Sequence, residues 1–189
     1  MEIIDSRLNL EASFTSTING RGTILNLDLH SETPLETQEK YVLLVLDISG
    51  SMCGNKLETS KQALSELVQM LYSKPHHPRI GLITFNQYPY FFNLSQASCN
   101  ECLETISAIT GYGGTAFIPV FNMISEILCG ERVKEAQSVK KVKKTESDQL
   151  LVQPLNIKEA AVVFLSDGQA ESLQTLRPHI AKLRKLAEE

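Results

Sequence analysis

The segment Tyr41-Val-Leu-Leu-Val-Leu-Asp-Ile-Ser-Gly-Ser-Met52 joins a continuous apolar run to an aspartate and two serines. An unbroken apolar run of this length is typical of a strand that is buried on both faces, as in a parallel sheet. We therefore predict that residues 41–46 form the central strand of such a sheet. Asp47, Ser49 and Ser51 then lie at its carboxyl end.

Alternating helices and strands are predicted after this segment. Apolar residues recur at helical spacing over residues 56–72. Apolar runs predict strands over residues 79–85, 90–94 and 160–165, the second as an edge hairpin with the first. Further helices are predicted behind a Ser98–Glu101 capping box, over residues 116–129, and from near Pro178 to the terminus. This order predicts an α/β fold, a Rossmann-like open and mostly parallel sheet flanked by helices.

The N-terminal part of the chain has a different sequence pattern. Residues 7–31 alternate polar and apolar side chains around Asn19-Gly20, which favours a β-hairpin before the α/β unit. We divide the chain into this hairpin segment, residues 1–36, and one α/β domain, residues 37–189. Lysines gather in residues 131–158, where large apolar residues are few. We expect an exposed insertion there, and a basic patch that binds a partner is the alternative.

The composition limits the partners and the compartment. A net charge of −4 gives no general attraction to nucleic acid. No run approaches the ~20 apolar residues of a membrane span, and the first residues lack a signal-peptide pattern, so we expect no membrane span and a cytoplasmic protein. Four cysteines are too few for a disulfide framework and fit a reducing compartment. Cys99 and Cys102 have the spacing of half a zinc site, but no second pair follows.

Polar side chains gather at the predicted strand ends. Asp47 ends the first buried strand and Asp167 ends the last one, and ligands of such sheets bind beyond the carboxyl ends of the strands. Ser49 and Ser51 follow Asp47, and Thr115 lies on a third loop. These oxygen-bearing groups from three loops favour a hard divalent cation such as Mg²⁺. The alternative is that both aspartates only cap helices.

These residues resemble the metal-ion-dependent adhesion site of von Willebrand factor type A domains. The resemblance rests on Asp47-Ile-Ser-Gly-Ser-Met52, Gly114-Thr115 and Ser166-Asp167-Gly168, in this order and with a helix after the first. A short string of this kind is weak alone, but three pieces at the expected strand ends form a specific pattern.

The resemblance implies a role for each residue. Ser49 and Ser51 would bind the metal directly, and Thr115 would do so when a ligand is bound. Asp47 and Asp167 would bind mostly through water. The metal would be Mg²⁺, with Mn²⁺ or Ca²⁺ as alternatives, and an Asp or Glu carboxylate of a partner protein would complete its coordination. The implied function is a metal-dependent protein–protein interaction module without enzymatic activity.

A narrower resemblance concerns the branch of the family. The phrases at Lys56-Leu57, Lys61-Gln-Ala-Leu64 and Leu165-Ser-Asp-Gly-Gln169 resemble the intracellular branch, including domains associated with ubiquitin ligases. The resemblance covers residues 41–189, whereas the family usually continues with one or two further strands and helices. We therefore expect that the C-terminal part of the usual fold is missing, either because this is a fragment or because another chain completes the sheet edge.

Two other functions are weighed against this one. A Mg²⁺-dependent phosphatase or phosphotransferase of the haloacid dehalogenase kind also places an Asp after a buried strand, but it needs a second Asp where this chain has Ser49. The other alternative is a scaffold whose metal site is vestigial. A metal titration would distinguish that scaffold from a metal-binding domain.

Overall fold

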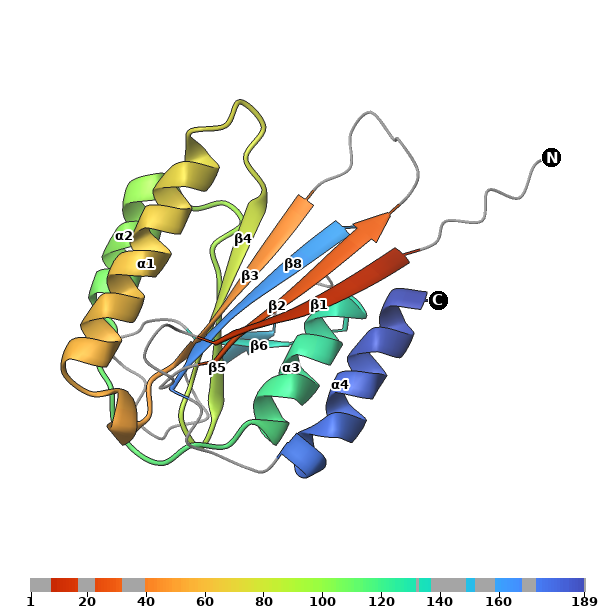
Figure 1. Cartoon of the computed structure of the whole chain (residues 1–189). Helices are drawn as coiled ribbons and strands as arrows, with labels where there is room; N and C mark the ends of the chain where they lie inside the picture. Colours follow the sequence, from red (N-terminus) through yellow and green to blue (C-terminus); the bar gives the residue numbers. More distant parts are fainter. Residues whose placement is uncertain are drawn as a thin grey trace.

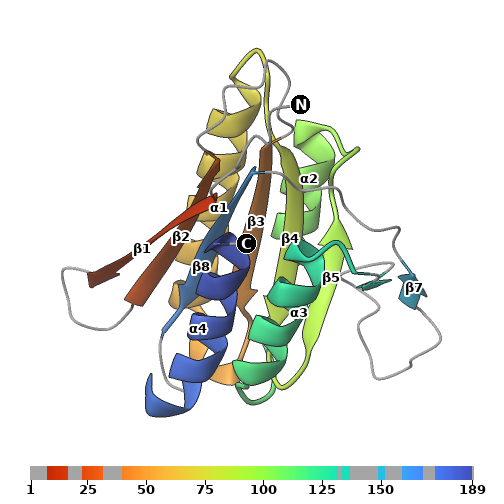
Figure 2. The ribbon, with the colours of Figure 1, turned by 90° about the vertical axis from the view of Figure 1, so that its right-hand side faces the viewer.

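The computed structural model describes residues 8–16, 23–31, 40–131, 133–136, 149–151, 159–167 and 173–188. In these residues an eight-stranded sheet lies between two layers of helices (Figures 1 and 2). The strands are β1 (Leu8–Ser16), β2 (Thr23–Ser31), β3 (Lys40–Asp47), β4 (Arg79–Phe85), β5 (Pro89–Asn93), β6 (Lys134–Ala136), β7 (Gln149–Leu151) and β8 (Glu159–Ser166). The helices are α1 (Asn55–Tyr72), α2 (Cys99–Ser107), α3 (Ile118–Leu128) and α4 (Leu173–Glu188), with a short 3₁₀ turn, η1 (Gly50–Met52). The strand order is β1-β2-β8-β3-β4-β5-β6-β7, and the predicted α/β fold is confirmed.

The centre of the sheet is parallel, because β3 pairs in parallel with β8 on one side and with β4 on the other. The apolar run predicted as the central strand is β3. Leu43 and Val45 face the core beneath α3 and α4, whereas Leu44 and Leu46 face the core beneath α1 and α2. All four side chains are fully buried. Burial on both faces is the reason why this strand is a continuous hydrophobic sequence.

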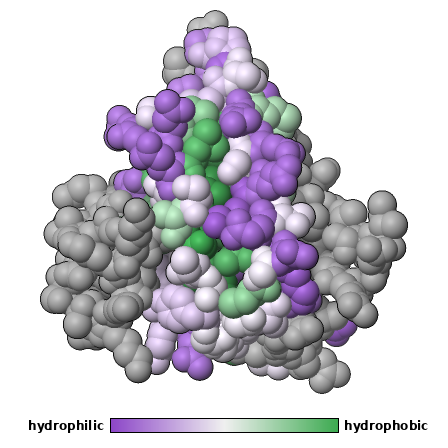
Figure 3. All heavy atoms as spheres, turned by 90° about the vertical axis from the view of Figure 1, so that its left-hand side faces the viewer, coloured by the Kyte–Doolittle hydropathy of each residue, from purple (hydrophilic) through white to green (hydrophobic). Residues whose placement is uncertain are grey.

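The helices form one layer on each face of the sheet. α1 and α2 cover one face, and α3 and α4 cover the other (Figures 1 and 2). α1 begins directly after Gly54, whose φ of +81° suits glycine better than other residues. The outer surface over α1 and α2 is largely hydrophilic, with a narrow apolar stripe along its length (Figure 3). The amphipathic character predicted for residues 56–72 is thus the reason why α1 packs on the sheet.

Antiparallel pairs, β2 with β8 and β5 with β4, flank the parallel centre of the sheet. β1 and β2 form the predicted hairpin, and β2 joins it to the sheet by pairing with β8. The expected turn at Asn19-Gly20 lies outside the described residues. β5 pairs with β4 as predicted, but the prediction that it is an edge strand is wrong, since β6 and β7 lie beyond it. Pairing at a sheet edge uses backbone groups and needs no apolar run, so composition does not reveal such strands.

The segment expected as an exposed insertion, residues 131–158, contributes these two short strands. Val133 is 4% exposed and Ala136 is 9% exposed, so both belong to the core. Residues 132, 137–148 and 152–158 of the segment lie outside the described residues.

The capping box predicted for α2 is present. Ser98 N donates to Glu101 Oε2 at 2.7 Å, and Glu101 N donates to Ser98 Oγ at 3.3 Å. The Ser98 backbone N–H and the Ser98 hydroxyl both donate to Glu101 Oε2, and these two hydrogen bonds lower the pKa of the Glu101 carboxyl. The reciprocal pair satisfies backbone donors that the start of a helix otherwise leaves free.

α4 departs from its predicted start. The helix begins at Leu173, and Pro178 lies inside it rather than at its first turn. A proline there removes one backbone hydrogen bond, and the burial of Leu176 and Leu183 in the core offsets that loss. Among the described residues, no helix combines the length and the apolar character that a membrane crossing requires.

Candidate metal centre

Asp47 and Asp167 lie at the carboxyl ends of the neighbouring strands β3 and β8. Leu46 pairs with Leu165 in the parallel register, so the residues that follow leave the sheet side by side. The Ser166 hydroxyl donates a hydrogen bond of 2.7 Å to Asp47 Oδ2. Asp47 is fully buried, and the Asp167 side chain is 4% exposed. The two strand ends therefore hold two carboxylates largely out of the solvent.

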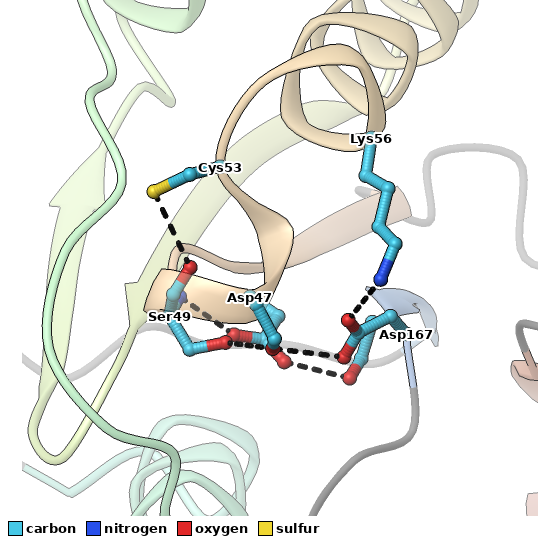
Figure 4. A network of polar contacts seen from close by, with 7 residues as sticks. Asp47, Ser49, Cys53, Lys56 and Asp167 are labelled. Atoms are coloured by element: carbon cyan, nitrogen blue, oxygen red, sulfur yellow. Dashed lines mark hydrogen bonds and ion pairs between the residues drawn. The ribbon is translucent and has the colours of Figure 1, made fainter.

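The loop after β3 brings two hydroxyls together, and one of them contacts Asp167. Ser49 N donates to Asp47 Oδ1 at 2.8 Å, which closes a tight turn. The Oγ atoms of Ser49 and Ser51 are 3.1 Å apart, and the Ser51 hydroxyl donates to Asp167 Oδ1 at 3.2 Å. Figure 4 shows this network. We call Asp47, Ser49, Ser51 and Asp167 the cup.

Thr115 lies on the loop 108–117, which packs against the loop after β3. Gly50 N donates to Gly113 O at 2.8 Å, and Tyr112 N donates to Ile48 O at 2.7 Å. Thr115 itself is half-buried. In the part of the chain that the structure describes, it forms no hydrogen bond with the cup. Four of the five residues singled out from the sequence thus share one hydrogen-bonded network, and the fifth lies on the adjoining loop.

Lys56 contacts the cup and was not anticipated from the sequence. Its Nζ lies 2.7 Å from Asp167 Oδ2, in an ion pair between residues 111 positions apart (Figure 4). Lys56 is the second residue of α1, which begins shortly after the loop that carries Ser51. Side chains in a helix tilt toward its N-terminus. The available signal was therefore a lysine in the first turn of the helix that follows the cup.

The donor set of the cup fits a hard divalent cation. It consists of carboxylate and hydroxyl oxygens, which are the ligands that Mg²⁺ prefers, and Mg²⁺ usually keeps several waters. In the described part of the chain, no three His, Cys, Asp or Glu side chains gather as a metal site, so an ion here would depend on the serine hydroxyls. The Lys56 ammonium shows that the Asp167 carboxylate accepts a cation. The residues present therefore fit the metal that the resemblance implies.

Two exposed tyrosines lie on loops beside the cup. Tyr88 is 62% exposed and Tyr112 is 42% exposed. The buried Asn86 holds both loops, because its Nδ2 donates to Tyr112 O at 3.2 Å and its Oδ1 accepts from Tyr88 N at 3.1 Å. Burial, together with the neighbouring Tyr112, raises the pKa of Tyr90 to about 12. Exposed aromatic side chains beside a polar centre are typical of protein-binding surfaces.

Solved structures of low sequence identity resemble this chain. The three N-terminal domains of the type V pili tip protein Mfa5 from Porphyromonas gingivalis are 16% identical with a TM-score of 0.45, and the match covers 74% of this chain and 29% of that one. The pilus adhesin SpaC from Lactobacillus rhamnosus GG is 17% identical with a TM-score of 0.43, over 67% of this chain and 17% of that one. The conserved hypothetical protein BatB from Bacteroides thetaiotaomicron is 13% identical with a TM-score of 0.40, over 79% and 99%.

The family comparison covers the centre of the chain. The search of curated proteins finds no match. The family model of the von Willebrand factor type A domain matches residues 42–120. This range contains the loop after β3 and Thr115, and it ends before Asp167. By this match, residues 42–120 are similar to the von Willebrand factor type A domain.

Proposed function

We propose that this domain is a metal-dependent protein-interaction module. The cup, together with Thr115, binds Mg²⁺ or Mn²⁺, and the bound ion captures an Asp or Glu side chain of a partner protein. The observation that carries the proposal is the network in which two buried carboxylates and two hydroxyls meet at the carboxyl edge of the sheet. Domains of this family are typically interaction modules rather than enzymes.

The residues of the cup would share the task of holding the ion. Ser49 and Ser51 offer two neutral oxygens that lie 3.1 Å apart. Both oxygens of Asp47 already accept protein hydrogen bonds, so this carboxylate is suited to orienting a metal-bound water. The ion supplies a positive charge that two carboxylates only balance, which leaves it able to attract a further carboxylate.

Tyr88 and Tyr112 would supply the contacts around the captured carboxylate. Aromatic side chains contribute a large contact area and are enriched among residues that dominate binding energy. Their exposure beside the cup indicates a partner segment in which an acidic residue is flanked by apolar ones. The cup would then fix the position of the acid, and the tyrosines would add affinity.

A phosphatase or phosphotransferase is the less supported function. Such an enzyme needs a second acid beside the first, at the position of Ser49, to protonate a leaving group. Among the described residues, the cup brings no third carboxylate to Asp47 and Asp167. The scaffold alternative, in which the metal site is vestigial, differs from our proposal in one measurable respect: it binds no ion.

Selection from a random-peptide phage library on the immobilised domain tests the proposal. In millimolar Mg²⁺ the selected peptides should share an Asp or Glu, because the ion attracts a carboxylate. EDTA should release them. Peptides that share no acid and stay bound in EDTA would count against the proposed function.

Two variants separate ion binding from peptide binding. Thr115→Ala removes a hydroxyl without changing charge, so Mn²⁺ should still bind while peptide affinity falls. Ser49→Asp adds a carboxylate, which should tighten Mn²⁺ binding and weaken the attraction of the ion for a peptide acid. Titration calorimetry with Mn²⁺ and then with a selected peptide measures both. If both variants still bound Mn²⁺ and kept the peptide affinity of the wild type, the ion would not be the contact point.

A further inference from the structure

Lys56 pairs with a carboxylate of the cup, and this contact bears on how the cup holds an ion. We propose that Lys56 is an internal counter-cation that competes with the divalent ion for Asp167 and so lowers the metal affinity of the cup. The inference rests on the proposed metal-binding function and concerns its regulation. The cup exchanges one cation, the ammonium, for another, the divalent ion.

The Asp167 carboxylate joins the cup to Lys56. Its Oδ1 accepts the Ser51 hydroxyl at 3.2 Å, and its Oδ2 accepts the Lys56 ammonium at 2.7 Å. The Asp167 side chain is 4% exposed, whereas the Lys56 side chain is 44% exposed. The acid is therefore enclosed by the protein, and the lysine can move into solvent while its backbone stays in place. This is the geometry of a displaceable counter-ion.

The start of α1 is an unfavourable place for a lysine unless an acid lies beside it. Lys56 is the second residue of the helix, where the aligned peptide dipoles present partial positive charge. Lys61 on the same helix points elsewhere: its Nζ lies 3.1 Å from Glu58 Oε1 and donates to Ile109 O at 3.2 Å. Asp167, rather than the helix, therefore accounts for the placement of the Lys56 ammonium.

The Lys56–Asp167 ion pair changes the net charge at the cup. Two carboxylates alone give a formal charge of −2, and the ammonium reduces it to −1. A divalent ion that enters must displace the ammonium or accept its repulsion, and both lower the affinity. Without a divalent ion, the ammonium neutralises a nearly buried carboxylate that would otherwise be costly to enclose. Lys56 thus stabilises the metal-free cup and opposes the metal-bound one.

A plain surface ion pair would behave differently. Exposed ion pairs contribute little to stability, and breaking such an ion pair is not expected to change metal affinity. The enclosed side chain of Asp167 separates this pair from that class, because the carboxylate is only 4% exposed in the folded protein.

Calorimetric titration with Mn²⁺ alone tests the inference. Lys56→Gln should bind Mn²⁺ on the order of tenfold more tightly than wild type, the size expected when one nearby positive charge is removed at a partly screened site. Lys56→Arg, which keeps the charge, should bind Mn²⁺ as wild type does. Lys74→Gln is the matched control for net charge, because Lys74 is exposed beyond the other end of α1. Its affinity should equal that of wild type.

Thermal unfolding provides a second reading. In EDTA, Lys56→Gln should unfold at a lower temperature than Lys74→Gln, and saturating Mn²⁺ should raise its Tm by more. If wild type binds Mn²⁺ and Lys56→Gln binds it no more tightly, the role of Lys56 is overturned and the proposed function stands. If neither protein binds Mn²⁺, both fail. Binding by Lys56→Gln alone would support the competition directly.

Discussion

The Ser166 hydroxyl donates a 2.7 Å hydrogen bond to Asp47 Oδ2, and this contact ties the end of β8 to the end of β3. The other oxygen of Asp47 accepts the Ser49 N–H at 2.8 Å. Asp47 is fully buried, so these donors replace the water that an exposed carboxylate would bind. The protein itself therefore orients the Asp47 carboxylate, without the help of a bound ion.

Ser166→Ala should lower the free energy of unfolding by about 1–3 kcal/mol, because it removes a donor from a buried charged acceptor. Chemical denaturation in EDTA measures this loss without a contribution from bound metal. Ser107→Ala is the control, since Ser107 is an exposed residue whose hydroxyl donates to a backbone carbonyl within α2. Equal stability of Ser166→Ala and wild type would contradict the role given to this contact.

The variant Gly113→Ala tests whether the backbone conformation at Gly113 holds the loop that carries Thr115. The φ of Gly113 is +83°, and a Cβ added there would lie 3.4 Å from Asn86 Nδ2. Gly113→Ala should reduce the free energy of unfolding by about 1–2 kcal/mol through backbone strain. It should also weaken binding of a selected acidic peptide, because the loop carries Thr115.

Gly54→Ala is the matched control for that variant. Gly54 has a φ of +81°, but nothing lies within 4 Å of an added Cβ, so only the backbone strain is shared. It should lose stability in denaturant titrations and keep the position of the Thr115 loop. Peptide affinity that falls equally in both variants would show that the loop contact is not the cause.

Tyr88→Ala should weaken the binding of a selected acidic peptide by about tenfold, a typical cost for an exposed aromatic anchor at an interface. Its stability should not change, since the Tyr88 side chain is 62% exposed. Met70 is 55% exposed and lies near the other end of α1, so Met70→Ala should leave peptide affinity unchanged. Fluorescence anisotropy with a labelled peptide measures both variants. A loss of affinity in Met70→Ala instead would place the binding surface on α1.

The strand ends of the cup could be predicted from the sequence because a strand buried on both faces has a visible end. The apolar run of β3 stops at Asp47, and that of β8 stops just before Asp167. Parallel pairing then brings two carboxylates together, whatever the intervening residues are. The capping box at Ser98 was equally local, since both partners lie within one helical turn.

Contacts between distant residues could not be predicted in this way. Lys56 and Asp167 are 111 positions apart, and their ion pair exists only after β8 has paired with β3. β6 and β7 are three residues long and are held by backbone pairing, which leaves no apolar pattern. Pro178 was misleading because burial of Leu176 and Leu183 stabilises a helix that propensity alone would end there.

The dissociation constant of a phage-selected acidic peptide, measured in saturating Mg²⁺ and again in EDTA, tests the central claim most directly. The same peptide with its acid changed to the amide serves as the control, because it keeps the shape and loses the charge. Binding in Mg²⁺ should weaken by at least about 100-fold in EDTA or on amide substitution, since each removes the same ion–carboxylate contact. Equal affinity in Mg²⁺ and in EDTA would contradict the account, because the cup would then not be the binding surface.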